Sequence, residues 1–176
     1  HLDLHSFPTR RSSDLLKSLA AGAKKNGYRF IEENGVITLK IDYRGIIRQL
    51  GSKVDNDYML YIDFRSKRIF DDQGNVRSYN DLGEFLVKSE RDLATIENQQ
   101  IKNMMRNELQ SFYVAFVQGM GPDRLFDEHN VLREQVKEAY QQIISNHPDT
   151  TTATAVKIVY DELAANNFEK PVDYEN

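Results

Sequence analysis

Cysteine is absent from the 176-residue sequence. Without thiols the chain can form no disulfide framework, thiolate zinc site or iron–sulfur cluster, and it has no cysteine nucleophile. Long hydrophobic runs are also missing, because no apolar stretch approaches the ~18 to 20 residues that a membrane-spanning helix needs. From composition we therefore expect no membrane partner and predict a cytoplasmic location.

Motifs for catalysis or ligand binding are scarce. Residues 71–75 resemble a calcium loop only superficially, because neither register supplies the glycine and the glutamate that an EF-hand requires; we predict a plain turn. Residues 119–122 are glycine-rich and precede a helix, but they lack the Lys-Ser/Thr of a P-loop and the third glycine of a dinucleotide loop. We predict a loop that ends a helix.

Two histidines outside the first fifteen residues are the remaining catalytic candidates. We expect His129 on a helix, where Arg133 rather than a metal ligand follows at i+4. We expect His147 at a helix C-terminus, where it interacts favourably with the helix dipole. No Gly-x-Ser-x-Gly marks a nucleophile, so the sequence predicts no catalytic, cofactor-binding or metal-binding residue. An enzyme with a site around His129 or His147 stays as an alternative.

The first fifteen residues look like a translated sequencing adapter. Residues 6–15, SFPTRRSSDL, are encoded by TCT TTC CCT ACA CGA CGC TCT TCC GAT CT, the end of a widely used short-read adapter. We therefore expect residues 1–15 to be non-native and the rest to be an N-terminally truncated fragment from an environmental or transcript assembly. The alternative is a genuine leader rich in serine and arginine. Non-native segments are set aside before the fold is considered.

Residues 16–80 read as a basic, strand-rich part. Two β-rich runs, 28–33 and 36–42, are joined by Asn34-Gly35, which is the strongest short-range hairpin signal. Residues 43–50 show helical spacing. We further predict a central strand at 58–64, because that run is apolar on both faces, and a short closing strand at 76–79.

Residues 81–176 read as an acidic, helical part. The spacing predicts a helix capped by Asn80 or Asp81, with a possible break near Ser89, and it places Leu109 and Phe112 in the core. A further helix is expected at about 123–146, and a last one after Asp149 and three threonines. The overall prediction is an α+β fold with an N-terminal antiparallel sheet of about three to five strands, followed by a three- to four-helix layer. We expect one compact domain.

Charge divides along the chain. Residues 16–70 carry 11 basic and 6 acidic side chains, a net of +5, whereas residues 71–176 carry 10 basic and 19 acidic, a net of −9. With few catalytic signatures, this partition favours a non-enzymatic intracellular structural or assembly protein that contacts itself or another protein. The candidate contacts, expected to meet head to tail, are Arg44, Arg48, Arg65 and Arg68 on one side and Glu134, Glu138, Asp161 and Glu162 on the other. The alternative is a nucleic-acid-binding module that uses the basic sheet surface, with tyrosines stacking on bases.

Overall fold

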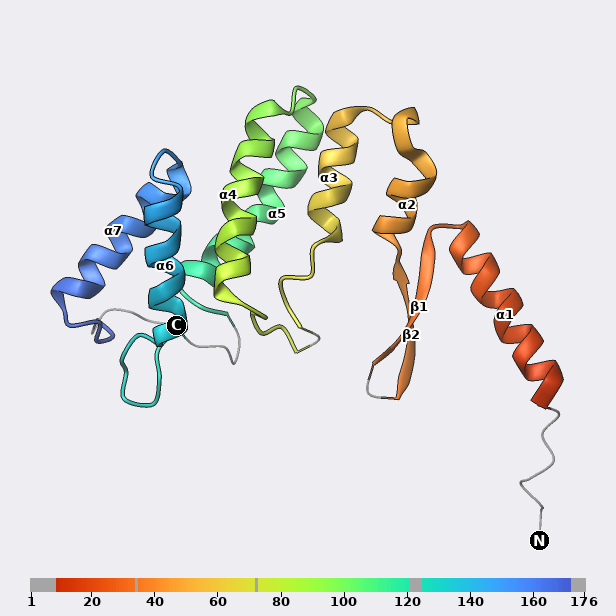
Figure 1. Ribbon diagram of the computed structural model, residues 1–176, viewed down its shortest axis with the longest axis horizontal. Helices are drawn as coiled ribbons and strands as arrows, with labels where there is room; N and C mark the ends of the chain where they lie inside the picture. The colour runs from red at the N-terminus through yellow and green to blue at the C-terminus, as the bar shows by residue number, and fades with distance from the viewer. Residues whose placement is uncertain (1–8, 34, 72, 121–124, 172–176) are drawn as a thin grey trace, which may run out of the picture. The chain divides into compact units, whose positions relative to one another are not determined.

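The computed structural model is an α+β fold, and it describes residues 9–33, 35–71, 73–120 and 125–171. Within these residues it has seven α-helices and one two-stranded antiparallel sheet (Figure 1). The chain divides into two compact units, residues 1–66 and 67–176, where we expected one compact domain that changes character at residue 80. We call them the N-terminal and C-terminal units and describe each by itself.

The N-terminal unit opens with helix α1 (Thr9–Lys25) and the predicted hairpin of β1 (Tyr28–Glu33) and β2 (Val36–Ile41). Gly27, with φ +78°, ends α1 because only glycine adopts this left-handed conformation without strain. Gly35, which lies in the connection between the two strands, has φ +77°. Residues 1–8 of the adapter-like segment and Asn34 of the turn lie outside the described residues.

Two helices complete the N-terminal unit. The predicted helix at 43–50 is confirmed as α2 (Tyr43–Leu50), and the Asp42 carboxylate caps it by accepting from the N–H of Gly45. A 3₁₀ turn (Gly51–Lys53) leads to α3 (Asn56–Ser66), which packs on α2. The strand predicted at 58–64 is therefore wrong. Asp55 accepts from the N–H of Asp57 at 2.8 Å and so starts a helix, and a run that is apolar on both faces fits a helix as well as a strand.

The C-terminal unit is built around helix α4 (Tyr79–Thr95). Helices α5 (Gln99–Val117), α6 (Glu134–Asn146) and α7 (Thr151–Ala165) all pack against α4, and α6 also packs on α7. The fully buried side chains of this core come from all four helices and from the loop before α6: Leu82, Leu86, Val87, Met105, Phe116, Leu125, Val136, Tyr140, Ile143, Val156 and Leu163. The hydroxyl of Tyr140 donates to the carbonyl of Phe116 at 2.7 Å, which satisfies a carbonyl in the last turn of α5.

The helix boundaries around α4 differ from the prediction. Ser78, rather than Asn80 or Asp81, caps α4 by accepting from the N–H of Asp81, so the strand predicted at 76–79 shrinks to a single bridge between Phe70 and Val76. The helix does not break at Ser89, which is buried inside it. The break comes at residues 96–98, where Asn98 caps α5 by accepting from the N–H groups of Gln100 and Ile101.

The segment before α6 is also different from the prediction. The helix expected at about 123–146 begins only at Glu134, and residues 125–133 form a turn in which Phe126 bridges to Leu132. The Asp127 carboxylate stabilises this turn by accepting from the N–H groups of His129 and Val131, both at 2.9 Å. These hydrogen bonds compete with a helix and end it early.

Two smaller predictions can be compared directly. Residues 71–75 form the predicted turn, with Gly74 at φ +85° and the Asp71 carboxylate accepting from the N–H groups of Gln73 and Asn75. Leu109 is buried as expected, but Phe112 is only partly buried, with its ring 4.8 Å from that of Phe85 and 5.3 Å from that of Phe70. Residues 121–122 of the glycine-rich loop lie outside the described residues.

Candidate interaction surface

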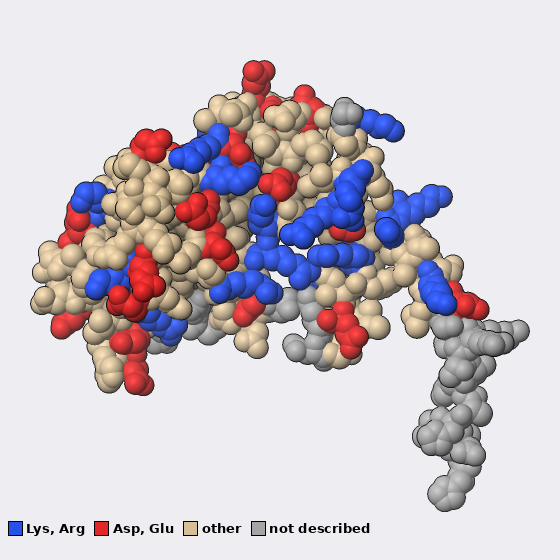
Figure 2. Space-filling view, viewed as in Figure 1, with Lys and Arg blue, Asp and Glu red and all other residues tan. Residues whose placement is uncertain are grey.

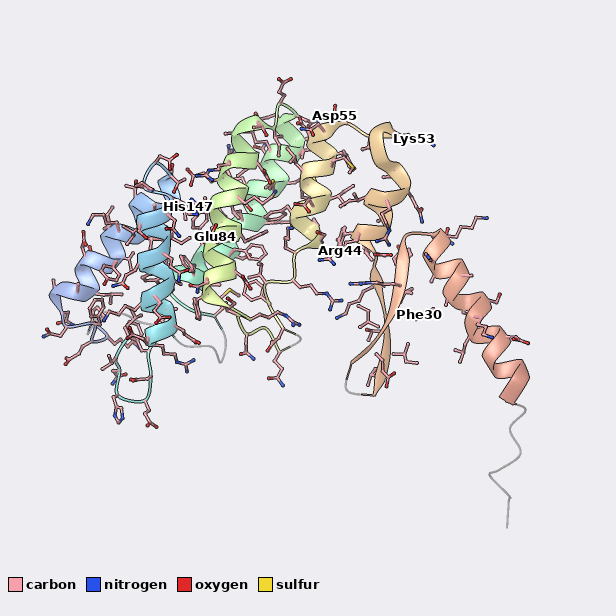
Figure 3. All side chains as sticks on the ribbon, in the orientation of Figure 1. Phe30, Arg44, Lys53, Asp55, Glu84 and His147 are labelled. Carbon is pink, nitrogen blue, oxygen red and sulfur yellow. The ribbon has the colours of Figure 1, made fainter. Side chains whose placement is uncertain are left out.

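The register of the hairpin gathers apolar side chains on one face. Five apolar residues lie here: Tyr28 opposite Ile41, Phe30 opposite Leu39, and Ile37, whose cross-strand partner Glu32 is the one charged residue on this face. Side chains directly opposite each other on antiparallel strands share a face, and side chains two residues apart do too. We call these five residues the apolar hairpin face; Phe30 marks its place in Figure 3.

Every member of the apolar hairpin face is exposed. The exposed fractions are 40% for Tyr28, 44% for Phe30, 63% for Ile37, 53% for Leu39 and 42% for Ile41. Tyr28 is among these exposed side chains, so the core of the N-terminal unit does not bury it. With two strands instead of three to five, the sheet is too small to form a second layer over its own apolar side.

The opposite face of the hairpin, which we call the basic face for its Arg29 and Lys40, is mixed, since it also carries Ile31 and the exposed Val36. Arg29 lies directly opposite Lys40, and Ile31 opposite Thr38. Lys and Arg side chains also lie over the neighbouring helix α2 (Figure 2). The hairpin therefore has one mostly apolar face and one mixed face that carries its two basic side chains.

The four basic candidates predicted from the sequence are all exposed, and they come from α2, from α3 and from the start of the C-terminal unit. Arg44 and Arg48 lie on α2, and Arg48 is 3.9 Å from the carboxylate of Asp42. Arg65, on α3, donates to the hydroxyl of Tyr43 at 3.2 Å, and its guanidinium lies 5.8 Å from the centre of that ring. Arg68 belongs to the C-terminal unit.

The four acidic candidates are exposed on two packed helices. Glu134 and Glu138 lie one turn apart on α6, and Asp161 and Glu162 are neighbours on α7. Asp161 already pairs with Lys157 at 2.6 Å. The structure thus groups the acidic residues within one unit, and their predicted pairing with the basic residues of another copy stays a prediction.

A polar cluster joins α4 to the end of α6. Nε2 of His147 lies 2.9 Å from Oε1 of Glu84 (Figure 3), and Nδ1 of His147 lies 3.4 Å from Nη2 of Arg91. Arg91 also lies 3.8 Å from the carboxylate of Asp149. His147 is at the helix end, as predicted, and the helix-end motif alone could not reveal that Glu84 lies beside it. A histidine held by a carboxylate is half of a general-base arrangement. The Thr150 hydroxyl donates to the backbone carbonyl of His147 at 2.8 Å, but no hydrogen bond found in the described part of the chain joins a serine, threonine or lysine side chain to the His147 ring.

His129 lies in a different environment from the one predicted. It is in the turn before α6 rather than on a helix, and its exposed ring is 3.6 Å from the carboxylate of the neighbouring Glu128. A solvent-exposed turn offers no enclosed surface for a substrate. His129 is therefore the weaker of the two histidine candidates.

A second network caps α7. The Glu90 carboxylate on α4 accepts from the N–H groups of Thr151 and Thr152 at 2.7 and 2.8 Å and from the Thr152 hydroxyl at 2.7 Å. The Tyr113 hydroxyl lies 2.7 Å from the same Thr152 oxygen. Burial raises the pKa of Glu90, but the hydrogen bonds from Thr152 and Thr151 outweigh it and hold that pKa below its usual value. Glu90 thus fixes α7 on α4.

Two further findings concern ligands and membranes. Among the described residues, no three or more His, Asp or Glu side chains gather closely enough to hold a metal ion. No helix in the same part of the chain combines the length and the apolar character that crossing a membrane would take.

Comparison with known proteins gives no assignment. No family model matches the chain, and no curated protein or solved structure matches it either. Because no relative indicates a function, the function is inferred from the exposed surfaces, chiefly from the apolar hairpin face. Ile37, Leu39 and Ile41 alternate with polar residues in the sequence, but their exposure follows from the small number of strands, which the sequence did not predict.

Proposed function

We propose that this chain is a non-enzymatic assembly protein that self-associates, and that the hairpin of residues 28–41 makes the contact. The observation that carries this proposal is the exposure of all five side chains of the apolar hairpin face. Scattered exposed apolar residues are normal, but a contiguous patch of them marks an interaction site or a binding groove.

The size of the patch supports this reading. A large apolar side chain has about 200 Å² of surface. The exposed fractions of the five residues therefore correspond to about 500 Å² of exposed apolar surface per copy. The largest patch on a typical monomer measures roughly 300–600 Å² and is often functional.

The fold offers a second argument. An isolated two-stranded hairpin is marginally stable in water, and it gains stability from further strands or from a covering layer. Among the described residues, no third strand joins the sheet. A second copy of the hairpin supplies both the missing strands and the missing apolar contacts.

A pair of matched variants tests the proposal. Ile37→Glu places a charge on the hairpin face, where Ile37 is 63% exposed, and Ile158→Glu makes the same change on α7 at a position 57% exposed. In sedimentation velocity over a range of concentrations, we expect the parent chain and Ile158→Glu to associate and Ile37→Glu to stay monomeric. A parent chain that is monomeric at every concentration contradicts the proposal, and so does equal association of both variants.

The salt dependence of association distinguishes this contact from the head-to-tail pairing predicted from charge. Contacts between Arg44, Arg48, Arg65 or Arg68 and the carboxylates of α6 and α7 would weaken as the screening length falls from about 8 Å toward 3 Å. Exposed ion pairs contribute only about 0 to 1 kcal/mol each. We therefore expect association through the apolar hairpin face to persist in high salt, and loss of association there would favour the charge-driven geometry.

One observation favours the nucleic-acid alternative. Arg29 and Lys40 lie directly opposite each other on the basic face of the hairpin, where both could contact phosphates. Binding to a single-stranded polynucleotide that falls steeply with salt, and that Arg29→Gln weakens, would support this function. Lys17→Gln on α1 is the control, because Lys17 is exposed and lies outside the sheet.

A further inference from the structure

The hydrogen-bond pattern of the hairpin follows from one bond beside it. The N–H of Asp42 donates to the carbonyl of Gly27 at 2.8 Å, and these two residues continue the register of β1 and β2. Directly opposed antiparallel residues alternate between pairs that exchange hydrogen bonds and pairs that do not. The bonded pairs are therefore Arg29 with Lys40, Ile31 with Thr38, and Glu33 with Val36.

The remaining residues of β2 direct their backbone groups away from β1. Ile37, Leu39 and Ile41 belong to the pairs that exchange no hydrogen bonds, so their N–H and C=O groups point to the outer edge of the strand. No hydrogen bond found among the described residues uses these groups outside the hairpin. The three residues that complete the apolar face of β2 thus also carry its free hydrogen-bonding edge.

This edge has few of the features that usually block strand addition, and Lys40 is its one charged residue. Natural edge strands are protected by proline, bulges, inward-pointing charges or a covering helix. Residues 36–41, VITLKI, contain no proline, and the register with β1 is continuous without a bulge. Helix α1 packs on β1, whereas β1 is the only element in the described part of the chain that makes an extensive contact with β2.

We propose that β2 of one copy pairs antiparallel with β2 of a second copy about a two-fold axis that passes between their Leu39 residues. Strand addition at an exposed edge is a common mode of protein recognition, and a two-fold contact uses the same surface on both copies. The product is a continuous four-stranded sheet. This inference rests on the proposed self-association and specifies its geometry.

Alternation and charge select this register. With Leu39 opposite its own copy, Ile37 lies opposite Ile41 of the partner, so the backbone groups that point outward on both strands meet. On the other face Lys40 lies opposite Thr38 of the partner. A shift that centres the axis on Lys40 would place two lysines directly opposite each other, which is destabilising. A shift that centres it on Thr38 leaves Ile41 without a strand partner.

The pairing has a consequence for the apolar hairpin face. Opposed residues of neighbouring strands share a face, so the two apolar hairpin faces join on one side of the new sheet. Ile37 contacts Ile41 of the partner, and the two Leu39 side chains contact each other. Three or more strands with an apolar face are what a small sheet needs for stability, so pairing stabilises each hairpin.

Single cysteines test the register, because the chain has none of its own. Opposed Cα atoms of a hydrogen-bonded pair lie ~5.5 Å apart, within the 4.4–6.8 Å range that a disulfide spans. In the proposed register, position 37 lies about 13 Å along the strand from position 37 of the partner. Under mild oxidation we expect Leu39→Cys to form a covalent dimer, and Ile37→Cys alone and Ile41→Cys alone to form none.

Two controls make the pattern decisive. An equal mixture of Ile37→Cys and Ile41→Cys should cross-link, since these positions are opposed across the axis. Ile158→Cys, on an exposed position of α7, gives the background from random collision. If the parent chain associates but Leu39→Cys cross-links no faster than Ile158→Cys, the register is wrong and the proposed function stands. A parent chain that never associates overturns both.

A backbone variant provides an independent measurement. Leu39→Pro removes an N–H that points away from β1, and proline is tolerated at such positions of edge strands. Leu39→Ala shortens the side chain but keeps the N–H. We expect Leu39→Pro to have the circular dichroism spectrum of the parent chain. Its dimer dissociation constant should be about tenfold higher than that of Leu39→Ala, which corresponds to about 1.4 kcal/mol. Equal dimerisation of the two variants contradicts strand pairing.

Discussion

The Nε2 atom of His147 lies 2.9 and 3.0 Å from the two carboxylate oxygens of Glu84, so the end of α6 is joined to the first half of α4. Nδ1 of the same ring faces the guanidinium of Arg91 at 3.4 Å. A neutral imidazole with its hydrogen on Nε2 donates to the carboxylate and accepts from the guanidinium, so both neighbours are satisfied. The side chain of His147 is 15% exposed, which limits competition from water.

We predict a measurable coupling between Glu84 and His147. In a double-mutant cycle with Glu84→Gln and His147→Gln, the coupling in the free energy of unfolding should be about 0.5 to 1 kcal/mol, since the Glu84 side chain is half exposed. Chemical denaturation of the four proteins measures it. Coupling below about 0.3 kcal/mol would show that this contact does not hold α4 to α6.

Glu90 makes the stability of the C-terminal unit depend on pH. Its pKa is held below the usual 4.5 despite burial, because Thr152 and Thr151 donate to the charged form. A carboxyl whose pKa is lower in the folded state binds protons more readily when unfolded. Its contribution is therefore complete above the unfolded pKa of about 4.5 and is lost as the pH falls through the folded pKa.

We predict that Glu90→Gln lowers the free energy of unfolding by about 1 to 3 kcal/mol near pH 7, the range for hydrogen bonds to a charged group. The difference from the parent chain should begin to shrink as the pH falls below about 4.5, and it should be lost once the pH lies below the folded pKa of Glu90, where the parent carboxyl is also neutral. Urea denaturation at several pH values checks this. Glu138→Gln, on an exposed face of α6, is the control; a pH-independent defect in Glu90→Gln would assign it to packing instead.

Local signals explain the parts of the fold that the sequence predicts well. The hairpin follows from Asn34-Gly35 between two β-rich runs, α2 from the spacing of Tyr43, Ile46 and Leu50, and α7 from the threonine cap at its start. In each case the residues that fix the conformation lie within a few positions of one another. Interactions between residues that are close in the sequence are enough to determine such elements.

The failed predictions depend on competition that a periodic pattern does not reveal. Residues 58–64 fit a strand or a helix equally well, and the Asp55 side chain decides for the helix. The helix expected from about residue 123 loses to the hydrogen bonds that Asp127 makes with the turn. Ser89 could have capped a new helix, but burial against neighbouring helices keeps α4 continuous.

The candidate site was predicted only in part. Composition pointed to protein contacts and to charged residues such as Arg44 and Glu134, which are exposed on α2 and α6. It could not show that Phe30 and Leu39 stay exposed, because exposure depends on how many strands and helices cover the sheet. The proximity of Glu84 and His147, 63 residues apart, likewise arises only from tertiary packing.

Removal of residues 1–15 should leave the C-terminal unit unchanged. The adapter-like segment continues into α1, which begins at Thr9, and Leu15 is 63% exposed. A chain that starts at Leu16 should unfold within about 0.5 kcal/mol of the parent, the usual limit for changes away from packed features. Thermal denaturation followed by circular dichroism measures this, and a loss above about 1 kcal/mol would show that the segment is structurally required.

Gly83 allows α4 to approach α5 and α6 closely. A Cβ atom at this position would lie 2.7 Å from Cγ1 of Ile143 and 3.1 Å from Cζ of Phe116. Both neighbours are almost fully buried, at 1% and 0% exposure. Interiors are close-packed, so neither side chain has room to move away.

Two effects of Gly83→Ala therefore oppose each other. Alanine gains about 1 kcal/mol over glycine inside a helix, whereas overpacking a core costs about 1 to 3 kcal/mol. Because contact at 2.7 Å is far below van der Waals distance, we expect overpacking to dominate and Gly83→Ala to destabilise the chain by about 1 to 2 kcal/mol. Gly22→Ala in α1, where nothing lies within 4 Å of the new Cβ, should show no loss.

A second substitution identifies the clash as the cause. Ile143→Val removes Cδ1, which would lie 2.9 Å from the new Cβ, and by itself it should cost about 0.5 to 1.5 kcal/mol. In the Gly83→Ala background it should cost less, because the lost methyl group relieves the overlap. Denaturant unfolding of the two single variants and the double variant measures this difference. Additive costs would mean that Ile143 does not limit the approach of α4 and α6, and that the effect of Gly83→Ala comes from Phe116 or from the backbone.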